Sequence, residues 1–328
     1  MNIGLIGCSG LVGIEFINLL EKNHLNIKYD NITLFASNRS ANKEILFDKN
    51  VMKISKLDEN SFDKLDVAIF CATSEVSKNF IPIAIKNNCI CIDNSSYFRL
   101  SPEVPLVIPE INSELIKDKM VIANPNCSTI LLCMVLNPLL KLGSIIKTNV
   151  CTYQCVSGAG KNGYIEFHQQ LQSLNKNSPN METNVFKRQY IMNCFSHNSD
   201  IDLDSGYNDE EIKMIKETKK ILDIDINVTC VRIPVIRSHC EAVSIEFDKI
   251  IKLEEIRNYL NLSDGIVIQD DRINNKFPEP LNTQNKFDIQ VGRIRYDLTN
   301  PKIVNLFLSG DQLLKGAALN AYQILSLV

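Results

Sequence analysis

The sequence predicts an α/β protein in two domains, a doubly wound parallel sheet followed by an α+β domain with a mostly antiparallel sheet. Two observations point to this class. Short apolar runs alternate with amphipathic stretches over the first third of the chain, and after residue 126 the apolar runs become longer, with irregular polar segments between them. The length of 328 residues also exceeds what one hydrophobic core usually organises, so two domains are expected.

The first domain is predicted over residues 1–126. Its apolar runs have the length of buried strands, and the stretches between them repeat their apolar residues with the period of a helix. Strands are expected at Ile3–Ile6, Ile32–Ala36, Val67–Ala72, Cys89–Ile92 and Met120–Ala123, and helices at Leu11–Lys22 and Val76–Asn87. Because strand and helix alternate, the sheet is expected to be parallel.

A glycine-rich loop joins the first strand to the first helix. It has the sequence Gly7-Cys8-Ser9-Gly10-Leu11-Val12-Gly13. Glycines in such a loop let backbone N–H groups approach a pyrophosphate at the helix N-terminus. An ordinary tight turn also uses glycines, but the strand–loop–helix context at the start of the chain favours a Rossmann-type dinucleotide-binding domain.

The end of the second strand indicates which dinucleotide is bound. An NAD site usually has a carboxylate there for the ribose hydroxyls. Here the run Ala36-Ser37-Asn38-Arg39-Ser40 has no carboxylate and places a guanidinium between hydroxyls. A guanidinium binds a phosphate in bidentate fashion. The sequence therefore predicts NADP as the cofactor, with Ser37, Arg39 and Ser40 at its 2′-phosphate.

The second domain is predicted over residues 127–310. Strands are expected at Thr148–Ser157, Asn227–Val235, Ala242–Phe247 and Lys302–Ser309, helices at Ser128–Leu140, Asp209–Leu222 and Leu253–Leu260, and loops at Asn175–Asn184 and Asn193–Asn208. The last segment, Gln312–Leu327, has a strong helical pattern. We expect it to pack back on the first domain, which residues 311–328 would complete.

One cysteine lies where a thiol becomes a nucleophile. In Asn124-Pro125-Asn126-Cys127-Ser128-Thr129 the proline ends a short strand and an apolar helix follows. Cys127 is therefore expected at a helix N-terminus, where unpaired N–H groups and the macrodipole favour an anion. Such a setting lowers a thiol pKa. A buried apolar role is the common alternative for a free cysteine.

Composition excludes several classes of function. The formal net charge of −3 gives no basic surface for nucleic acid or an anionic membrane. No apolar run approaches the roughly 18 residues of a membrane span, and the N-terminus lacks a signal-peptide pattern. With four His and no zinc-type spacing, no metal site is expected. Eleven scattered cysteines indicate a reducing cytoplasm.

Separated segments of the chain, all in the same order, resemble the bacterial aspartate-semialdehyde dehydrogenases. They are Gly7–Gly13, Ser37–Lys43, Asp93–Arg99, Asn124–Thr129, Gln154–Gly160, Glu210–Lys213, Arg232–His239 and Lys315–Asn320. The resemblance covers nearly the whole chain. It implies NADPH-dependent reductive dephosphorylation of L-aspartyl 4-phosphate to L-aspartate 4-semialdehyde, in the biosynthesis of lysine through diaminopimelate, threonine and methionine, by a homodimer or tetramer.

The resemblance also implies a role for each site residue. Cys127 would form an acyl thioester, His239 would be the general acid/base and Gln154 would position the substrate. In the substrate-binding set, Arg99 and Lys213 would hold the phosphate with Asn126 nearby, Arg232 the α-carboxylate and Glu210 the ammonium group. The cofactor-binding set is Gly7, Ser9, Gly10, Leu11, Val12, Ser37, Arg39, Ser40, Ser157, Gly158 and Gln312. His24, His168 and His197 are expected to be structural.

Two other interpretations stay open. An N-acetyl-glutamyl-phosphate reductase shares the fold and the cysteine, although its motif usually has Gly where this chain has Asn126, and its acylated substrate has no ammonium for Glu210. A catalytically silent homologue that acts as a binding subunit is the second, although Cys127 and His239 are both kept. The chain also departs from the family at Ser238, where Gly is common, and at Gln312, where Asn is common.

Overall fold

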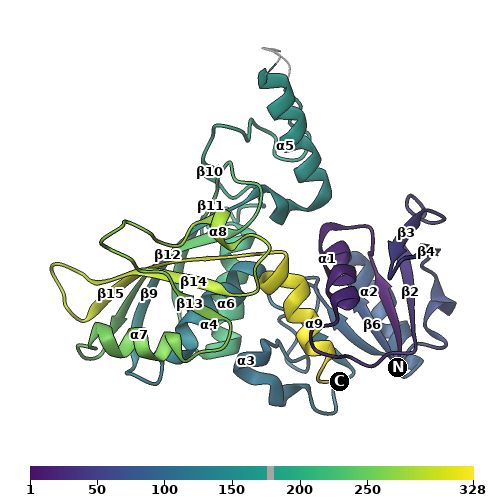
Figure 1. The fold of residues 1–328 in the computed structure, drawn as a ribbon, viewed down its shortest axis with the longest axis horizontal. Helices are drawn as coiled ribbons and strands as arrows, with labels where there is room; N and C mark the ends of the chain where they lie inside the picture. Colours follow the sequence, from purple (N-terminus) through teal and green to yellow (C-terminus); the bar gives the residue numbers. More distant parts are fainter. Residues whose placement is uncertain (176–180) are drawn as a thin grey trace. The chain divides into compact units, whose positions relative to one another are not determined.

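A computed structural model describes residues 1–175 and 181–328 and divides the chain into two compact units (Figure 1). Unit 1 consists of Met1–Asn126 and Gly316–Val328, and unit 2 of Cys127–Lys315. Half of the predicted loop Asn175–Asn184 lies outside the described residues. None of the described helices is long and apolar enough to span a bilayer.

Unit 1 is built on a six-stranded sheet in which every neighbouring pair is parallel. Its order is β5-β2-β1-β6-β7-β8, with β1 (Asn2–Ile6), β2 (Asn31–Ala36), β5 (Ser55–Lys56), β6 (Val67–Phe70), β7 (Ile90–Asp93) and β8 (Val121–Ala123). Helices α1 (Leu11–Lys22) and α2 (Ser74–Lys86) connect the central strands. This strand order is that of a doubly wound dinucleotide-binding sheet, whose direction reverses between β1 and β6. The predicted fold class is therefore confirmed.

Short elements complete unit 1. They are the hairpin β3 (Glu44–Phe47) and β4 (Asn50–Lys53), the turns η1 (Glu59–Phe62) and η2 (Ser113–Ile116), and the helix α3 (Pro109–Asn112). The sequence analysis did not predict them. Each is four residues long, too short to show a helical or strand period.

The C-terminal segment returns to unit 1. The predicted single helix Gln312–Leu327 is instead a π-helical turn, η4 (Leu314–Ala318), followed by α9 (Leu319–Leu325). Tyr322 packs edge-on against Phe16 of α1 with a ring-centroid distance of 6.1 Å. Its hydroxyl also donates to Asn23 Oδ1 over 3.0 Å. Aromatic packing and this hydrogen bond together fix α9 against α1.

Unit 2 is built on a seven-stranded mixed sheet. Its order is β10-β11-β9-β12-β15-β14-β13, with β9 (Ile145–Gln154), β10 (Phe195–Ser196), β11 (Ile226–Arg232), β12 (His239–Phe247), β13 (Ile266–Ile268), β14 (Ile289–Tyr296) and β15 (Ile303–Gly310). The pairs β9–β11 and β13–β14 are parallel and the other four are antiparallel. The predicted mostly antiparallel sheet is thus confirmed, although the short β10 and β13 and the eight-residue β14 were not predicted.

The helices α4 (Cys127–Leu139), α6 (Asp209–Leu222), α7 (Leu253–Asn261) and the short α8 (Pro280–Thr283) pack against unit 2's sheet. Almost every residue of α4 is buried, as expected for a helix that is apolar on all sides. Burial alternates along β9, where Thr148, Val150, Thr152 and Gln154 are all buried. The alternation places these side chains on one face of the sheet.

Strands β9 and β11 both end earlier than predicted, and β12 begins at His239 rather than at residue 242. Strand β9 ends at Gln154, and the turn η3 (Val156–Ala159) and helix α5 (Gly160–Asn175) follow it. Helix α5 was not predicted, because its sequence contains two glycines and few apolar residues. It is held by tertiary contacts instead: Phe167 packs with Phe186 and Tyr190, and buried Glu166 accepts the N–H groups of residues 185 and 186. Strand β11 ends at Arg232 rather than residue 235.

Candidate active site

Cys127 is the first residue of helix α4. Strand β8 ends at Ala123, and Pro125 separates strand from helix because it cannot continue the ladder. The Cys127 side chain is half-buried, and its Sγ lies 3.3 Å from Nε2 of His239. A thiol at a helix N-terminus within hydrogen-bonding distance of an imidazole has the geometry of an activated nucleophile.

His239 is the first residue of β12 and is only 1% exposed. Its Nδ1 accepts the backbone N–H of Cys155 over 3.1 Å. Burial, and after it the charge of Arg232, lowers the pKa of His239 to about 3, although Glu210 opposes the shift. The imidazole is therefore neutral near pH 7.

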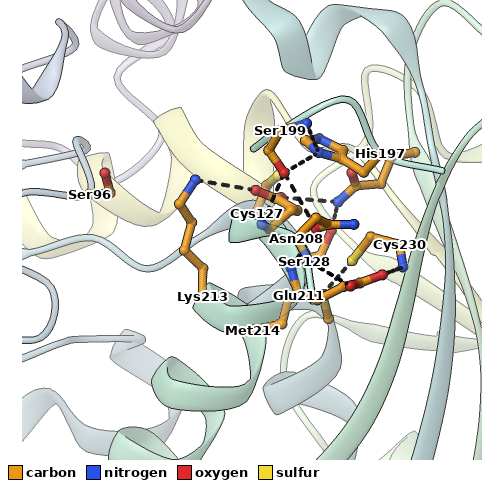
Figure 2. Close-up of polar contacts among 12 residues, drawn as sticks. Ser96, Cys127, Ser128, His197, Ser199, Asn208, Glu211, Lys213, Met214 and Cys230 are labelled. Atoms are coloured by element: carbon orange, nitrogen blue, oxygen red, sulfur yellow. Dashed lines mark hydrogen bonds and ion pairs between the residues drawn. The ribbon is translucent and has the colours of Figure 1, made fainter. Parts of the chain in front are cut away.

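Gln154 and Glu210 lie together beside α4. The Gln154 amide nitrogen donates to Ser128 Oγ over 2.7 Å and to Glu210 Oε1 over 3.1 Å. Glu210 is buried in the first turn of α6, and Lys213 Nζ lies 3.7 Å from its other oxygen. In Figure 2 a dashed line from the nitrogen of Lys213 marks this ion pair. The first turn of α6 thus brings a carboxylate and a cation to the end of β9.

Arg232, the last residue of β11, is 5% exposed and converges with His239. Its Nη1 donates to the Cys155 carbonyl over 3.0 Å, and its Nε donates to Asn198 Oδ1 over 3.3 Å. A Cβ added at Gly158 would lie 3.2 Å from His239 Cε1 and 3.3 Å from Arg232 Nη1. The absence of a side chain at Gly158 therefore leaves space against both groups.

Gln312 connects Ser157 with the residue before the histidine. Its Oε1 accepts the backbone N–H of Ser238 over 2.7 Å, and its amide nitrogen donates to Ser157 Oγ. Ser157 Oγ donates in turn to the carbonyl of Ile236. Ser238 has a φ of 76°, in the left-handed region that glycine adopts without strain. A serine there is under backbone strain, and the Gln312 bond holds the strained segment in place.

The glycine loop of unit 1 has the conformation that close approach of a phosphate requires. Gly7 has a φ of +84°, and a Cβ there would lie 2.3 Å from the carbonyl oxygen of Cys71. A Cβ on Gly13 would lie 2.4 Å from the Gly7 carbonyl oxygen. Only glycine fits at either position. Ser9 Oγ donates to Ser40 Oγ over 3.2 Å, so the loop and the segment after β2 are adjacent, and Arg39 is exposed there.

Arg99 and Asn126 belong to unit 1 and are both buried. Arg99 Nη2 donates to the carbonyl of Asn94 over 2.8 Å. The side chains of Asn94, Asn124 and Asn320 form a chain, in which Asn124 donates to Asn94 Oδ1 over 2.9 Å and Asn320 donates to Asn124 Oδ1 over 2.6 Å. These amides connect the loop that carries Arg99, the turn before Cys127 and helix α9.

His197, which the sequence analysis expected to be structural, lies close to the site residues. It lies beside Ser199 in Figure 2, with 3.0 Å between its Nδ1 and Ser199 Oγ. Burial lowers its pKa to about 4, and the charges of Arg232 and Lys213 act in the same direction. No sequence motif marks His197. It reaches the site because strand β10, which precedes it, pairs with β11, the strand that ends at Arg232. In residues 1–175 and 181–328, no cluster of His, Cys, Asp or Glu could hold a metal ion.

Comparisons with known proteins identify the family. Residues 2–119 match the NAD-binding domain of the semialdehyde dehydrogenases, and residues 136–315 match their dimerisation domain. An aspartate-semialdehyde dehydrogenase from Prochlorococcus marinus is 40% identical over 100% of this chain and 96% of its own length. Another from Rickettsia bellii is 41% identical over 98% and 96%. The chain belongs to the aspartate-semialdehyde dehydrogenase family.

Solved aspartate-semialdehyde dehydrogenases share the fold along the whole chain. The aspartate semialdehyde dehydrogenase II of Vibrio cholerae has a TM-score of 0.93 at 37% identity, covering 98% of this chain and 96% of that one. The same enzyme complexed with ASA has a TM-score of 0.94 at 36% identity, with 99% and 97% covered. The predicted resemblance to aspartate-semialdehyde dehydrogenases is therefore confirmed.

Proposed function

We propose that this chain reduces L-aspartyl 4-phosphate to L-aspartate 4-semialdehyde, with NADPH as the reductant and phosphate as the product released. The observation that carries the proposal is the pairing of Cys127 Sγ with His239 Nε2, in the same unit as Arg232 and Glu210. A thiolate suits acyl transfer from an acyl phosphate, and a cation and an anion together suit an α-amino acid. The products supply the biosynthesis of lysine, through diaminopimelate, and of threonine and methionine.

Cys127 acts as the nucleophile. Its thiolate attacks the acyl carbon, a C–S bond forms, and the C–O bond to phosphate breaks to leave a thioester. Bound NADPH supplies the hydride that reduces this thioester. The C–S bond then breaks to release the aldehyde and restore the thiolate. His239 Nε2–H stabilises the negative charge on sulfur and on the carbonyl oxygen as each develops.

One set of residues binds the amino-acid end of the substrate, and another set binds its phosphate. Arg232 pairs with the α-carboxylate and Glu210 with the ammonium group, while Gln154 aligns the acyl carbon. Arg99, Lys213 and Asn126 bind the phosphate. The carboxylate of Glu210, which Gln154 and Lys213 hold in place, supplies a fixed anion that suits a free ammonium group. This favours aspartyl phosphate over an N-acetylated substrate.

Unit 1 binds the cofactor, and its residues favour NADP. Gly7, Ser9, Gly10, Leu11 and Val12 form the phosphate-binding loop, and Ser37, Arg39 and Ser40 receive the 2′-phosphate. The fit rests on two features: the loop has room only for backbone, and no carboxylate follows β2. Ser157, Gly158 and Gln312 are assigned to the nicotinamide end.

Two further properties belong to the proposal. We expect a homodimer or tetramer, since the second half of the chain matches a dimerisation domain. We expect a cytoplasmic location, since all eleven cysteines are free. The domain boundaries of residues 1–126 with 311–328, and of residues 127–310, are proposed as folding units.

The deciding experiment measures NADP reduction by the purified protein with L-aspartate semialdehyde and phosphate. Turnover that needs both compounds supports the function, and parallel assays with N-acetyl-glutamate semialdehyde test the alternative substrate. Absence of turnover with titratable thiols intact indicates a silent binding subunit and overturns the proposal.

The cofactor assignment needs its own assay. We expect kcat/KM for NADP to exceed that for NAD by at least about tenfold, roughly 1.4 kcal/mol. Arg39→Ala should remove most of this preference, whereas Lys53→Ala on β4 removes the same charge elsewhere in unit 1 and should leave it unchanged. Equal use of NAD and NADP by the unmodified protein would make the cofactor assignment wrong.

A further inference from the structure

The segment that follows strand β10 consists of His197, Asn198 and Ser199 and is here named the 197–199 segment. It contacts Arg232 and Glu210, the two residues assigned to the amino-acid end of the substrate. Phe195 of β10 pairs with Arg232 in the sheet register, and the N–H of His197 donates to the Cys230 carbonyl over 2.8 Å. The segment is therefore held by the backbone of β11, the strand that ends at Arg232.

Asn198 orients the guanidinium of Arg232. Its Oδ1 accepts from Nε over 3.3 Å, while Nη1 donates to the Cys155 carbonyl over 3.0 Å. A guanidinium offers five N–H groups in a rigid plane, and a carboxylate binds to two of them at once. With Nε donating to Asn198 and one N–H of Nη1 donating to Cys155, the second N–H of Nη1 and the N–H groups of Nη2 are left for a carboxylate. Asn198 thus selects one of the two bidentate modes.

Ser199 orients Glu210. Its hydroxyl accepts the backbone N–H of Glu210 over 3.2 Å and lies 3.4 Å from Asn208 Oδ1 (Figure 2). Asp200 and Asn208 accept the N–H groups of residues 209 and 211 on either side. These three acceptors satisfy the first turn of α6, where an unsatisfied N–H weakens the helix end. Ser199 thus accepts the backbone N–H of Glu210, the residue whose carboxylate is assigned to the ammonium group.

His197 completes the segment without adding charge. Its Nδ1 accepts the N–H of Ser199 over 3.2 Å, which fixes the turn. The pKa of His197 is lowered to about 4 by burial and by Arg232 and Lys213, with Glu210 acting the other way. The imidazole is therefore neutral near pH 7 and does not compete with Arg232 for a carboxylate.

We propose that the 197–199 segment positions the amino-acid-recognition pair, with Asn198 fixing Arg232 for the α-carboxylate and Ser199 fixing Glu210 for the ammonium group. The inference rests on the proposed function, since it takes aspartate semialdehyde as the ligand of that pair. Neither residue is assigned contact with the reacting atoms. Both act through the residue that they hold.

The test compares the KM for L-aspartate semialdehyde with the KM values for phosphate and NADP in the oxidative direction. Asn198→Ala should raise KM for L-aspartate semialdehyde about tenfold, as expected when a charged group loses a hydrogen bond. Because Asn198 acts only on Arg232, KM for phosphate and for NADP should stay within about twofold. Ser199→Ala should raise the KM for semialdehyde about fivefold and leave the other two KM values unchanged. Ser199→Thr should keep the KM for semialdehyde of the unmodified protein, because threonine keeps the hydroxyl.

Matched controls come from the same part of the chain. Asn193→Ala removes an amide that donates to the Gln189 carbonyl, and Ser196→Ala removes an exposed hydroxyl. Both should keep the KM for semialdehyde. Thermal denaturation of every variant checks folding. A variant with lowered stability is judged by the ratio of its KM for semialdehyde to its KM for phosphate, because general destabilisation leaves this ratio unchanged.

The outcomes separate the two proposals. An unmodified protein without turnover overturns the proposed function and this inference with it. An active unmodified protein whose Asn198→Ala and Ser199→Ala variants keep the KM for semialdehyde, or raise all KM values together, overturns the inference alone.

Discussion

The backbone N–H of Cys155 donates to Nδ1 of His239 over 3.1 Å. A nitrogen that accepts a hydrogen bond from a fixed N–H does not itself carry a proton, so we assign the proton of neutral His239 to Nε2. Nε2 is the nitrogen that lies 3.3 Å from Cys127 Sγ. His239 is thus arranged to donate to a thiolate in the free protein, and an imidazolium would place two N–H groups against each other.

The first prediction concerns this tautomer. We expect ¹⁵N NMR of the free protein to show His239 as the neutral Nε2–H form from pH 5 to 8, because burial and Arg232 lower its pKa to about 3. The signal is assigned by its loss in His239→Gln. A His239 resonance that titrates near its ordinary value, 6.5, would contradict the assignment.

The second prediction concerns the nucleophile. Cys127→Ser should lower kcat at least about 10³-fold, because a hydroxyl is a far weaker nucleophile than a thiolate at neutral pH. The thermal midpoint should change little, since the two side chains are similar in size and Cys127 is half-buried. Cys194→Ser, at an exposed thiol, should keep full activity. If Cys127→Ser retained turnover, another residue would have to be the nucleophile.

Sequence reasoning was sufficient where a local pattern determines local structure. Helices α1 and α6 begin and end at the predicted residues, because apolar period and capping residues lie within each segment. The position of Cys127 at a helix start followed from Pro125 and the apolar run after it. The parallel pairing of unit 1's sheet followed from the alternation of strand and helix.

Features that depend on long-range contacts could not be predicted. Arg232 and His239 are separated by an irregular segment, and their convergence beside Gly158 depends on the pairing of β9 with both β11 and β12. His197 was expected to be structural, because nothing local distinguishes it from other histidines. Helix α5 has weak helical propensity and depends on its contacts with Phe186 and Tyr190.

The third prediction concerns the space at Gly158. In Gly158→Ala the added methyl would lie 3.2 Å from His239 Cε1 and 3.3 Å from Arg232 Nη1, so one of them must shift. We expect kcat/KM for aspartate semialdehyde to fall about tenfold or more, since small displacements of catalytic groups are costly. Gly206→Ala is the control: it adds a methyl where no atom lies within 4 Å, and although its φ of +77° lowers stability, kcat/KM should be kept. Unchanged kcat/KM in Gly158→Ala would show that this space is not used.

The fourth prediction concerns backbone strain at Ser238. With φ at 76°, Ser238→Gly should raise the free energy of unfolding by about 1 kcal/mol, because the left-handed conformation costs other residues more than glycine. Urea denaturation measures the change. Ser244→Gly, at a regular position of β12, should lower stability instead, because glycine weakens a strand interior. A loss of stability in Ser238→Gly would show that the serine side chain contributes more to stability than its backbone strain costs.

Glu241, on β12 two residues after His239, is a fully buried carboxyl group. Among the described residues, neither of its oxygens has a hydrogen-bond partner, and its neighbours in the sheet register are Thr152 and Leu308. Burial raises the pKa of Glu241 well above its ordinary value of 4.5. The folded protein therefore keeps a proton that the unfolded chain releases above pH 4.5. The contribution of protonated Glu241 to the free energy of unfolding is therefore complete below pH 4.5. It is lost as the pH rises towards the pKa of Glu241 in the folded state.

The fifth prediction follows from this loss of stability with rising pH. Glu241→Gln keeps a neutral side chain of the same shape and removes the ionisation, so its stability relative to the unmodified protein should increase with pH by about 1.4 kcal/mol per pH unit above 4.5. Urea denaturation at pH 5, 6 and 7 measures the difference, and Glu246→Gln makes the same change at a half-buried position of β12. A difference that stays constant from pH 5 to 7 would mean that Glu241 is ionised in the fold, and a cation or water would then have to lie beside it.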